Sequence, residues 1–337
     1  MIVSWNTTNK CNMYCKHCYR NSGIEVQNEL NTREGKSLLD EIAKAGFKIM
    51  IFSGGEPLMR PDIYELIRYA SEIGLRPVLG SNGTLITVET AMRLKDAGVM
   101  GIGISLDSLD MKKHDTFRNY KNGWNKAVAG MKICRKVGLP FQIHTTVMNW
   151  NKDEISDIID FAVNIGASAH HIFFLVPTGR GINIENEMLG REEYEKTLKN
   201  IMLRQKEVSI ELKPTCAPQF TRIAAENNVK TRFRKGCLAG TSYCIISPRG
   251  DVQACPYMDA SVGNIRQIPF SRIWSENSVL KKLRTSNYKG KCGSCSYGKI
   301  CGGCRARAAF YSNGDIMAED IWCSYSDVEE EKVNSGQ

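Results

Sequence analysis

Six short apolar runs rich in β-forming residues, each followed by an amphipathic stretch, constrain the fold of this chain more than any other feature. Such units are typical of parallel strands that alternate with helices. The predicted strands are Ile2–Thr7, Ile49–Phe52, Pro77–Gly80, Gly101–Leu106, Phe141–Val147 and His170–Val176. The repetition predicts an α/β fold built as a partial (β/α)6 TIM-like barrel.

The predicted helices between these strands share a stop signal, because each ends close to a glycine that can cap it. They are Thr32–Ala45, Asp62–Ile73, Val88–Ala97, Trp124–Val137 and Lys152–Ile165, and the glycines are Gly46, Gly74, Gly98, Gly138 and Gly166. A further helix is predicted at Arg191–Lys206, after the last strand. Residues 1–206 are therefore expected to form the barrel and its C-terminal helix.

The rest of the chain has a different composition. Nine of the thirteen cysteines lie from Cys216 to Cys323, in a stretch rich in Gly, Ser and short turns. Because this stretch has too little apolar periodicity to build its own core, we expect bound metal to cross-link it. We predict a cysteine-rich domain at residues 207–326 and a polar tail at 327–337.

The chain has no long apolar run and no export signal at its beginning, which predicts a cytoplasmic protein without a membrane span. Thirteen cysteines in that compartment indicate metal ligands rather than disulfides, since the cytosol keeps thiols reduced. The net charge of +9 is compatible with nucleic acid, an anionic membrane or an acidic small substrate. Lysine and arginine are scattered without a compact basic segment, so no nucleic-acid partner is expected.

The first chemical motif is the CxxxCxxC of Cys11, Cys15 and Cys18, directly after the first predicted strand. Three thiolates on one loop can hold three irons of a [4Fe–4S] cluster and leave the fourth iron open. The alternative is zinc, but no fourth ligand lies nearby, and His17 would strain a tetrahedral site beside Cys18. The position at the carboxyl end of a barrel strand also suits an active site.

This motif resembles the CxxxCxΦC signature of the radical S-adenosylmethionine (SAM) superfamily, with His17 at the aromatic position. The resemblance implies that the open iron binds SAM and that an electron from the cluster cleaves it to a 5′-deoxyadenosyl radical. Ser53-Gly-Gly-Glu-Pro57 is similar to the GGE motif that receives the SAM amino group. The residues that the resemblance assigns to SAM are His17, Gly54, Gly55, Glu56, Asn82, Ser105 and Arg118.

Two of these roles also have a physical reason. Glu56 could neutralise an ammonium, and Arg118 could pair with the SAM carboxylate through its forked guanidinium. His144 and Thr146 are predicted to alternate toward the inside of the barrel, where His144 is either a cavity residue or a core histidine.

The second motif runs from Cys237 through Gly250 and Cys255 to a CxxC, a CGGC and a last cysteine at Cys323. It resembles the seven-cysteine SPASM domain, an auxiliary cluster domain of the SPASM/twitch type. The spacing departs from that pattern once, with two residues rather than three between Cys301 and Cys304. Paired zinc knuckles are the alternative.

Two auxiliary [4Fe–4S] clusters follow from this resemblance. Cys237, Cys255 and Cys304 would hold one, with Cys216 as its natural fourth ligand; without Cys216 that cluster would have an open iron. The other would be held by Cys292, Cys295, Cys301 and Cys323. Cys244 is a weaker candidate ligand, and Cys134 is predicted to be a buried structural thiol.

Several segments look like the tetrapyrrole branch of this superfamily, which contains NirJ, AhbC and AhbD, and the position of the first cysteine looks most like the AhbD type. The segments are Ile2–Asn9, Phe173–Gly181, Lys213–Pro218 and Gly236–Gly240. The resemblance implies oxidative decarboxylation of two propionates of iron-coproporphyrin III to vinyl groups, giving haem b. It also implies a low-potential electron donor such as ferredoxin or flavodoxin.

An anionic tetrapyrrole needs cationic partners, and we predict Arg180 as the main candidate, with Arg305 and Arg307 as further ones. Two other activities stay open. One is a related removal of tetrapyrrole side chains, either the deacetylation of didecarboxysirohaem or a step of haem d1 formation. The other is a SPASM-type peptide maturase, although the chain has little room for an added peptide-binding domain.

Overall fold

The computed structural model describes residues 1–325, and the predicted tail at 327–337 lies outside them. One curved ten-stranded sheet runs through the molecule in the order β10-β9-β8-β1-β2-β3-β4-β5-β6-β7. Its strands are β1 (Ile2–Asn6), β2 (Ile49–Ser53), β3 (Arg76–Ser81), β4 (Ile102–Ser105), β5 (Phe141–Val147), β6 (Ala169–Phe174), β7 (Glu211–Thr215), β8 (Tyr243–Ile246), β9 (Asp251–Gln253) and β10 (Ser261–Asn264).

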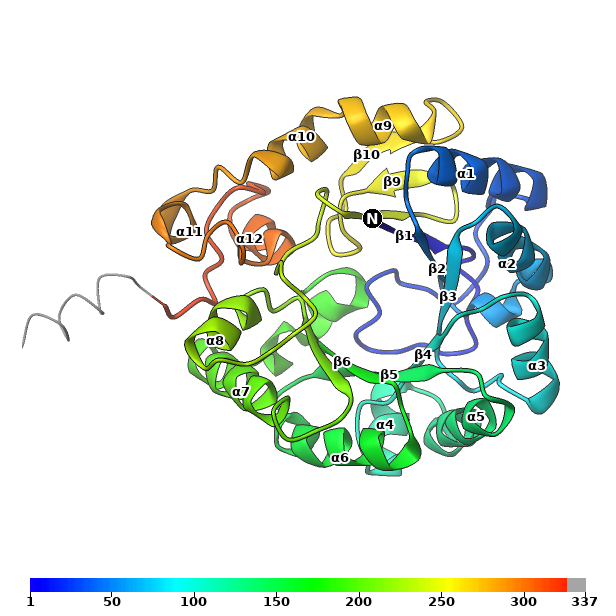
Figure 1. Cartoon of the computed structure of the whole chain (residues 1–337), viewed down its shortest axis with the longest axis horizontal. Coiled ribbons are helices and arrows are strands. Elements are labelled where there is room, and N and C mark those ends of the chain that lie inside the picture. Colours follow the sequence, from blue (N-terminus) through cyan, green and yellow to red (C-terminus); the bar gives the residue numbers. More distant parts are fainter. Residues whose placement is uncertain (326–337) are drawn as a thin grey trace, which may run out of the picture.

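Helices surround the sheet on its outside, and the loop after β1 lies inside the ring that they form (Figure 1). The helices of the barrel are α1 (Thr32–Lys44), α2 (Ile63–Glu72), α3 (Val88–Asp96), α4 (Met111–Arg118), α5 (Gly123–Val137), α6 (Ile155–Ile165) and α7 (Arg191–Arg204). Those of the C-terminal third are α8 (Phe220–Glu226), α9 (Phe270–Glu276), α10 (Ser278–Thr285), α11 (Gly290–Ser294) and α12 (Arg305–Tyr311). No helix within residues 1–325 is long and apolar enough to cross a membrane.

The six predicted βα units are present, and β1 to β6 pair in parallel as expected. The five glycines predicted to close the helices all adopt a positive φ, between 70° and 95°. Glycine reaches this left-handed region without the steric cost that a Cβ brings. Each βα unit therefore ends where the sequence predicts, and the next strand can return to the sheet.

The sheet also continues past residue 206. β7 pairs in parallel with β6, and β8 pairs in parallel with β1 at the other side. β9 and β10 then extend the sheet as antiparallel strands. The division of the chain at residue 206 stays a prediction, and hydrogen bonds of the sheet connect the two parts on either side of it.

Alternation along the strands separates a core face from an inner face. On β5, Phe141, Ile143 and Val147 are buried in the apolar core under the helices. His144 and Thr146 point the other way, toward the inside of the curved sheet, and are half-buried. This agrees with the predicted direction of both side chains, and it places polar groups where the loop after β1 also lies.

Candidate functional site

The cluster loop, residues 8–23, follows β1 and carries Cys11, Cys15 and Cys18. Two backbone amides point at its sulfur atoms: Met13 N–H donates to Cys11 Sγ (3.4 Å) and Ser22 N–H to Cys18 Sγ (3.5 Å). Burial raises the pKa of Cys11 to about 12. Since a thiolate there needs a bound cation to offset the lost hydration, these donors and thiols fit an iron–sulfur cluster.

At Gly54 and Gly55 the loop after β2 packs directly against the backbone of the cluster loop. Gly55 N–H donates to Thr8 O and Glu56 N–H donates to Lys10 O, both at 2.8 Å. A Cβ on Gly55 would lie 2.2 Å from Lys10 O, far inside van der Waals contact. The two glycines therefore allow a backbone approach that no other residue permits.

Glu56 is fully buried and its carboxylate is shared by three donors from this region. Ser81 Oγ–H (2.9 Å), Asn82 N–H (2.8 Å) and Leu58 N–H (3.2 Å) all donate to it. Burial raises its pKa to about 7. The carboxylate thus braces the loop after β2 against the end of β3, and its predicted contact with the SAM ammonium stays a prediction.

Asn82 extends this brace to the cluster loop. Its Nδ2 donates to Asn12 Oδ1 (2.7 Å), while its Oδ1 accepts from Thr84 Oγ1 (2.6 Å). Asn12 lies between the first two cysteines, so the end of β3 positions the loop that carries them. Ser105, half-buried, ends β4 on the inner face beside His144.

Arg118 forms a buried ion pair with Asp107, with Nε donating to Oδ2 at 2.7 Å. Its Nη1 lies 4.0 Å from Cys15 Sγ, so the guanidinium points toward the cluster loop. The Arg118 guanidinium offsets burial and lowers the pKa of Asp107 to about 2. His17 stacks on Phe117 at 4.4 Å between ring centroids, and burial lowers its pKa to about 3. His17 is therefore a neutral ring that packs against α4.

Arg180 lies against the cluster loop, not free at the mouth of the barrel. Its Nε donates to Cys15 O (2.8 Å), and its Nη1 donates to Ser22 O (2.7 Å) and Asn21 Oδ1 (3.1 Å). The guanidinium also stacks on Tyr14, with Cζ 3.7 Å from the ring centroid. These contacts favour a role in holding the loop, and the predicted contact of Arg180 with substrate stays untested.

The first auxiliary set brings together Cys216, Cys237, Cys255 and Cys304, which come from four separate segments. Cys216 interacts directly with Cys304, and both Cys237 and Cys255 lie close enough to Cys304 for their charges to interact. Cys216 has a left-handed backbone with φ of 60°, which turns the chain sharply after β7. This geometry fits the predicted four-thiolate site with Cys216 as the fourth ligand.

The second set lines a cavity of about 170 Å³. Its walls include Cys292, Cys295, Cys301 and Cys323, with Gly298, Gly302 and Gly303 between them. Glycines there leave room beside the thiols for a group of cluster size. Four cysteines around one cavity fit a second cubane.

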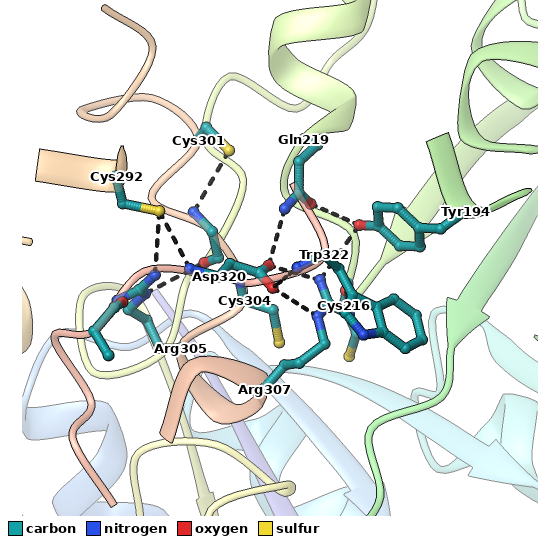
Figure 2. A network of polar contacts seen from close by, with 12 residues as sticks. Tyr194, Cys216, Gln219, Cys292, Cys301, Cys304, Arg305, Arg307, Asp320 and Trp322 are labelled. Atoms are coloured by element: carbon teal, nitrogen blue, oxygen red, sulfur yellow. Dashed lines mark hydrogen bonds and ion pairs between the residues drawn. The ribbon is translucent and has the colours of Figure 1, made fainter. Parts of the chain in front are cut away.

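A buried acid joins the two sets (Figure 2). Asp320 accepts Cys304 N–H at 2.8 Å, and its own N–H donates to Cys292 Sγ at 3.4 Å. It also forms a two-pronged ion pair with Arg307, at 2.8 and 2.7 Å. Each set therefore has a polar contact with the same residue, one through its side chain and one through its backbone N–H.

This network corrects the expectation that Arg305 and Arg307 bind substrate carboxylates. Both side chains are almost fully buried. Arg307 donates hydrogen bonds to Asp320 and to Cys216 O (3.1 Å). Arg305 donates to Ala318 O (2.6 Å) and to Cys292 Sγ (3.8 Å). Sequence reasoning could not foresee this, because their partners lie in other segments of the chain.

The remaining cysteines have other surroundings. Cys134 on α5 and Cys244 on β8 are fully buried in the apolar core, which agrees with the structural role predicted for Cys134. Within residues 1–325, no three side chains of His, Cys, Asp or Glu lie close enough together to hold a single metal ion.

A residue that the sequence reasoning missed is Lys213 on β7, buried and on the inner face beside His171.

Two family models match the chain. Residues 5–162 match the radical SAM superfamily, and residues 237–305 match the SPASM iron-sulfur cluster-binding domain. The second match shows iron–sulfur rather than zinc chemistry for the C-terminal cysteines. The described geometry of both cysteine regions agrees with these families.

Relatives that match over nearly the whole chain identify the family more narrowly than the two domain models do. The chain is 43% identical to the AdoMet-dependent heme synthase of Methanosarcina barkeri, covering 96% of each chain. It is 42% identical to the protein of that name from Nitratidesulfovibrio vulgaris, covering 96% of this chain and 92% of the relative. Identity to the Fe-coproporphyrin III synthase of Methanosarcina barkeri is 32%, over 96% of this chain and 87% of the relative.

Among solved structures, Streptococcus suis SuiB bound to S-adenosylmethionine has the same fold, with a TM-score of 0.78 at 18% identity. The match covers 96% of this chain and 77% of SuiB. The chain belongs to the radical SAM superfamily, in the SPASM-containing family whose members include the AdoMet-dependent heme synthases.

Proposed function

We propose that this protein is a radical SAM heme synthase that converts two propionates of iron-coproporphyrin III to vinyl groups. The observation that carries the proposal is the 43% identity to a heme synthase over nearly all of both chains. The three cysteines of the cluster loop and the two auxiliary cysteine sets support the proposal.

Each propionate must lose one hydrogen atom from its β-carbon, one molecule of carbon dioxide and one electron. The bond between the α-carbon and the carboxylate breaks, and a carbon–carbon double bond forms between the α- and β-carbons. When bound, the cluster and SAM supply the one-electron chemistry that removes hydrogen from an unactivated carbon. The proposal requires an acceptor for the electron, and an auxiliary cluster is suited to that task.

Within this proposal, residues of the chain have the following roles. Cys11, Cys15 and Cys18 hold the cluster, and the bracing by Glu56 and Asn82 fixes their loop. Arg118, held by Asp107 and directed at the cluster loop, would bind the SAM carboxylate. The auxiliary sets lie in the C-terminal third, which the sheet joins to the barrel through β8.

The net charge of +9 favours attraction of a substrate with four carboxylates. A low-potential donor such as ferredoxin or flavodoxin would reduce the SAM cluster, and we place the enzyme in the cytoplasm. All thirteen cysteines lie within residues 1–325 and are free of disulfides there, which suits a reducing compartment.

The test is anaerobic incubation of reconstituted protein with SAM, a reductant and iron-coproporphyrin III, followed by mass analysis of the porphyrin. We expect two losses of one formic-acid equivalent each, with 5′-deoxyadenosine formed in step. Iron analysis should give about twelve irons per chain, four for each of three cubanes.

One result would contradict the proposal. Unchanged iron-coproporphyrin III, with acetate lost instead from didecarboxysirohaem, would favour the related tetrapyrrole activity. A matched protein with Cys11, Cys15 and Cys18 replaced by alanine serves as the control. It should retain auxiliary iron and lose 5′-deoxyadenosine formation.

A further inference from the structure

A row of polar side chains crosses the inner face of four neighbouring strands. The strand register places Ser105 on β4 opposite His144 on β5, His144 opposite His171 on β6, and His171 opposite Lys213 on β7. Residues paired in this way in parallel strands point to the same side of the sheet. The row therefore runs along the inside of the barrel, from the end of β4 to β7.

Lys213 ends this row and is the unusual member. It is 8% exposed, and its Nζ lies 3.9 Å from the ring centroid of Phe220 and 4.0 Å from that of Phe233. No hydrogen bond or ion pair of Nζ is present among residues 1–325. The closest acidic residue along the strand, Glu211, pairs instead with Arg232 at 3.6 Å.

Burial lowers the pKa of Lys213 to about 7, although the charges of Glu211, Cys216 and Cys237 favour its protonated form. Two aromatic faces offset part of the cost of burying an ammonium. A carboxylate that enters the barrel beside Nζ would pair with it and keep it protonated.

The rest of the row carries no charge that would compete for this anion. His144 and His171 stack at 5.2 Å between ring centroids, and His171 also meets the edge of Phe233 at 6.4 Å. Burial holds the pKa of both histidines below its usual range, so both rings are neutral. Within the row, Lys213 is then the residue that can carry a positive charge near neutral pH, since its pKa is about 7.

We propose that Lys213 binds a carboxylate of the substrate, with the flat rings of His144 and His171 forming the wall beside it. The inference rests on the proposed function, because an anionic tetrapyrrole supplies both the carboxylate and a flat face. It assigns the carboxylate contact to Lys213, whose Nζ makes no hydrogen bond or ion pair within the described part of the chain. The three arginines considered from the sequence have guanidiniums engaged elsewhere.

The experiment compares Lys213→Met and Lys213→Gln, which remove the charge and keep most of the stem, with Lys213→Arg, which restores it. The control is Lys230→Met, an exposed lysine of the adjoining loop. Binding of iron-coproporphyrin III is followed by porphyrin absorbance without reductant, so that no turnover occurs. The tetramethyl ester of the same porphyrin is the uncharged probe.

We expect both neutral variants to bind the tetra-acid roughly ten- to a hundredfold more weakly than wild type, the usual effect of losing one charge-assisted contact. Lys213→Arg should recover much of the affinity, and Lys230→Met should match wild type. Affinity for the ester should differ little between wild type and the neutral variants.

The possible outcomes distinguish a failure of the role inferred for Lys213 from a failure of the proposed heme synthase function. Wild-type binding with unchanged affinity in both neutral variants would overturn the role of Lys213 and leave the function intact. Unchanged affinity combined with a shifted midpoint potential of an auxiliary cluster would assign Lys213 to the cluster near Cys216. If wild type itself failed to bind the porphyrin, the proposed function would fall, and the inference with it.

Discussion

At the scale of single residues, Gly55 decides how closely the loop after β2 can approach the cluster loop. We predict that Gly55→Ala separates the two loops, because the new methyl group would meet Lys10 O at 2.2 Å. The loss of the Glu56–Lys10 hydrogen bond should follow. The variant should incorporate about four fewer irons and lose SAM binding, which iron analysis and equilibrium dialysis would measure.

A matched control is Gly190→Ala, since no atom lies within 4 Å of the added carbon and the backbone φ of Gly190 is −68°. That variant should keep full iron content. Equal iron content in both variants would show that the cluster loop does not depend on the close approach.

Arg180 gives a second prediction at this scale. Arg180→Met should loosen the cluster loop, because the guanidinium donates to two backbone carbonyls and one amide oxygen of that loop. We expect faster loss of iron from the SAM cluster in air and weaker SAM binding, with auxiliary iron retained. If the variant instead lost only porphyrin affinity while keeping its SAM cleavage, Arg180 would be the propionate ligand that the sequence suggested.

At the scale of elements, Asp320 connects α12 and both auxiliary cysteine sets, and it also accepts a hydrogen bond from Gln219 Nε2 (2.9 Å), just before α8. We predict that Asp320→Asn destabilises this region by about 3–5 kcal/mol, because the charge of Arg307 would stay buried without its partner. Auxiliary iron should fall while iron at Cys11, Cys15 and Cys18 remains. Thermal unfolding and Mössbauer spectroscopy would measure both effects.

The comparison for this variant is Asp315→Asn, which breaks the ion pair with Lys289, a side chain that is 67% exposed. Such pairs contribute about 0–1 kcal/mol. Similar losses in the two variants would mean that burial of the Asp320–Arg307 pair is unimportant.

At the scale of the whole molecule, buried histidines should make the protein sensitive to acid. His170 is fully buried beside Thr145 Oγ1 (2.8 Å), and burial lowers its pKa from 6.5 to about 3. The unfolded chain takes up a proton at this residue below pH 6.5 and the folded chain does not. The free energy of unfolding should therefore fall by about 1.4 kcal/mol for each pH unit between these values.

His170→Gln removes this protonation and keeps a group that can bond Thr145. We expect wild type to lose more thermal stability than this variant when the pH is lowered from 7.5 to 5.5. Differential scanning calorimetry under anaerobic conditions would measure the midpoints. Parallel losses in both proteins would assign the acid sensitivity to other groups.

The parts of the molecule that sequence alone could predict are those set by local spacing. β1 to β6 follow from short apolar runs, and the cluster loop follows from three thiols within eight residues. β7 was missed because Lys213 and Pro214 interrupt its apolar pattern. The roles of Arg305 and Arg307 were wrong and that of Arg180 stays open, because their contacts depend on segments brought together only by folding.

The parallel pairing of β8 with β1 also has a consequence for biosynthesis. As the chain leaves the ribosome, β1 can pair with β2 once residue 53 has emerged, but its other edge waits for residue 246. During that interval the nascent chain displays a free strand edge beside the thiols of the cluster loop. Free edges are templates for pairing with other chains. Fragments that end before β8 keep that edge open permanently, so aggregation is the expected fate of chains released early.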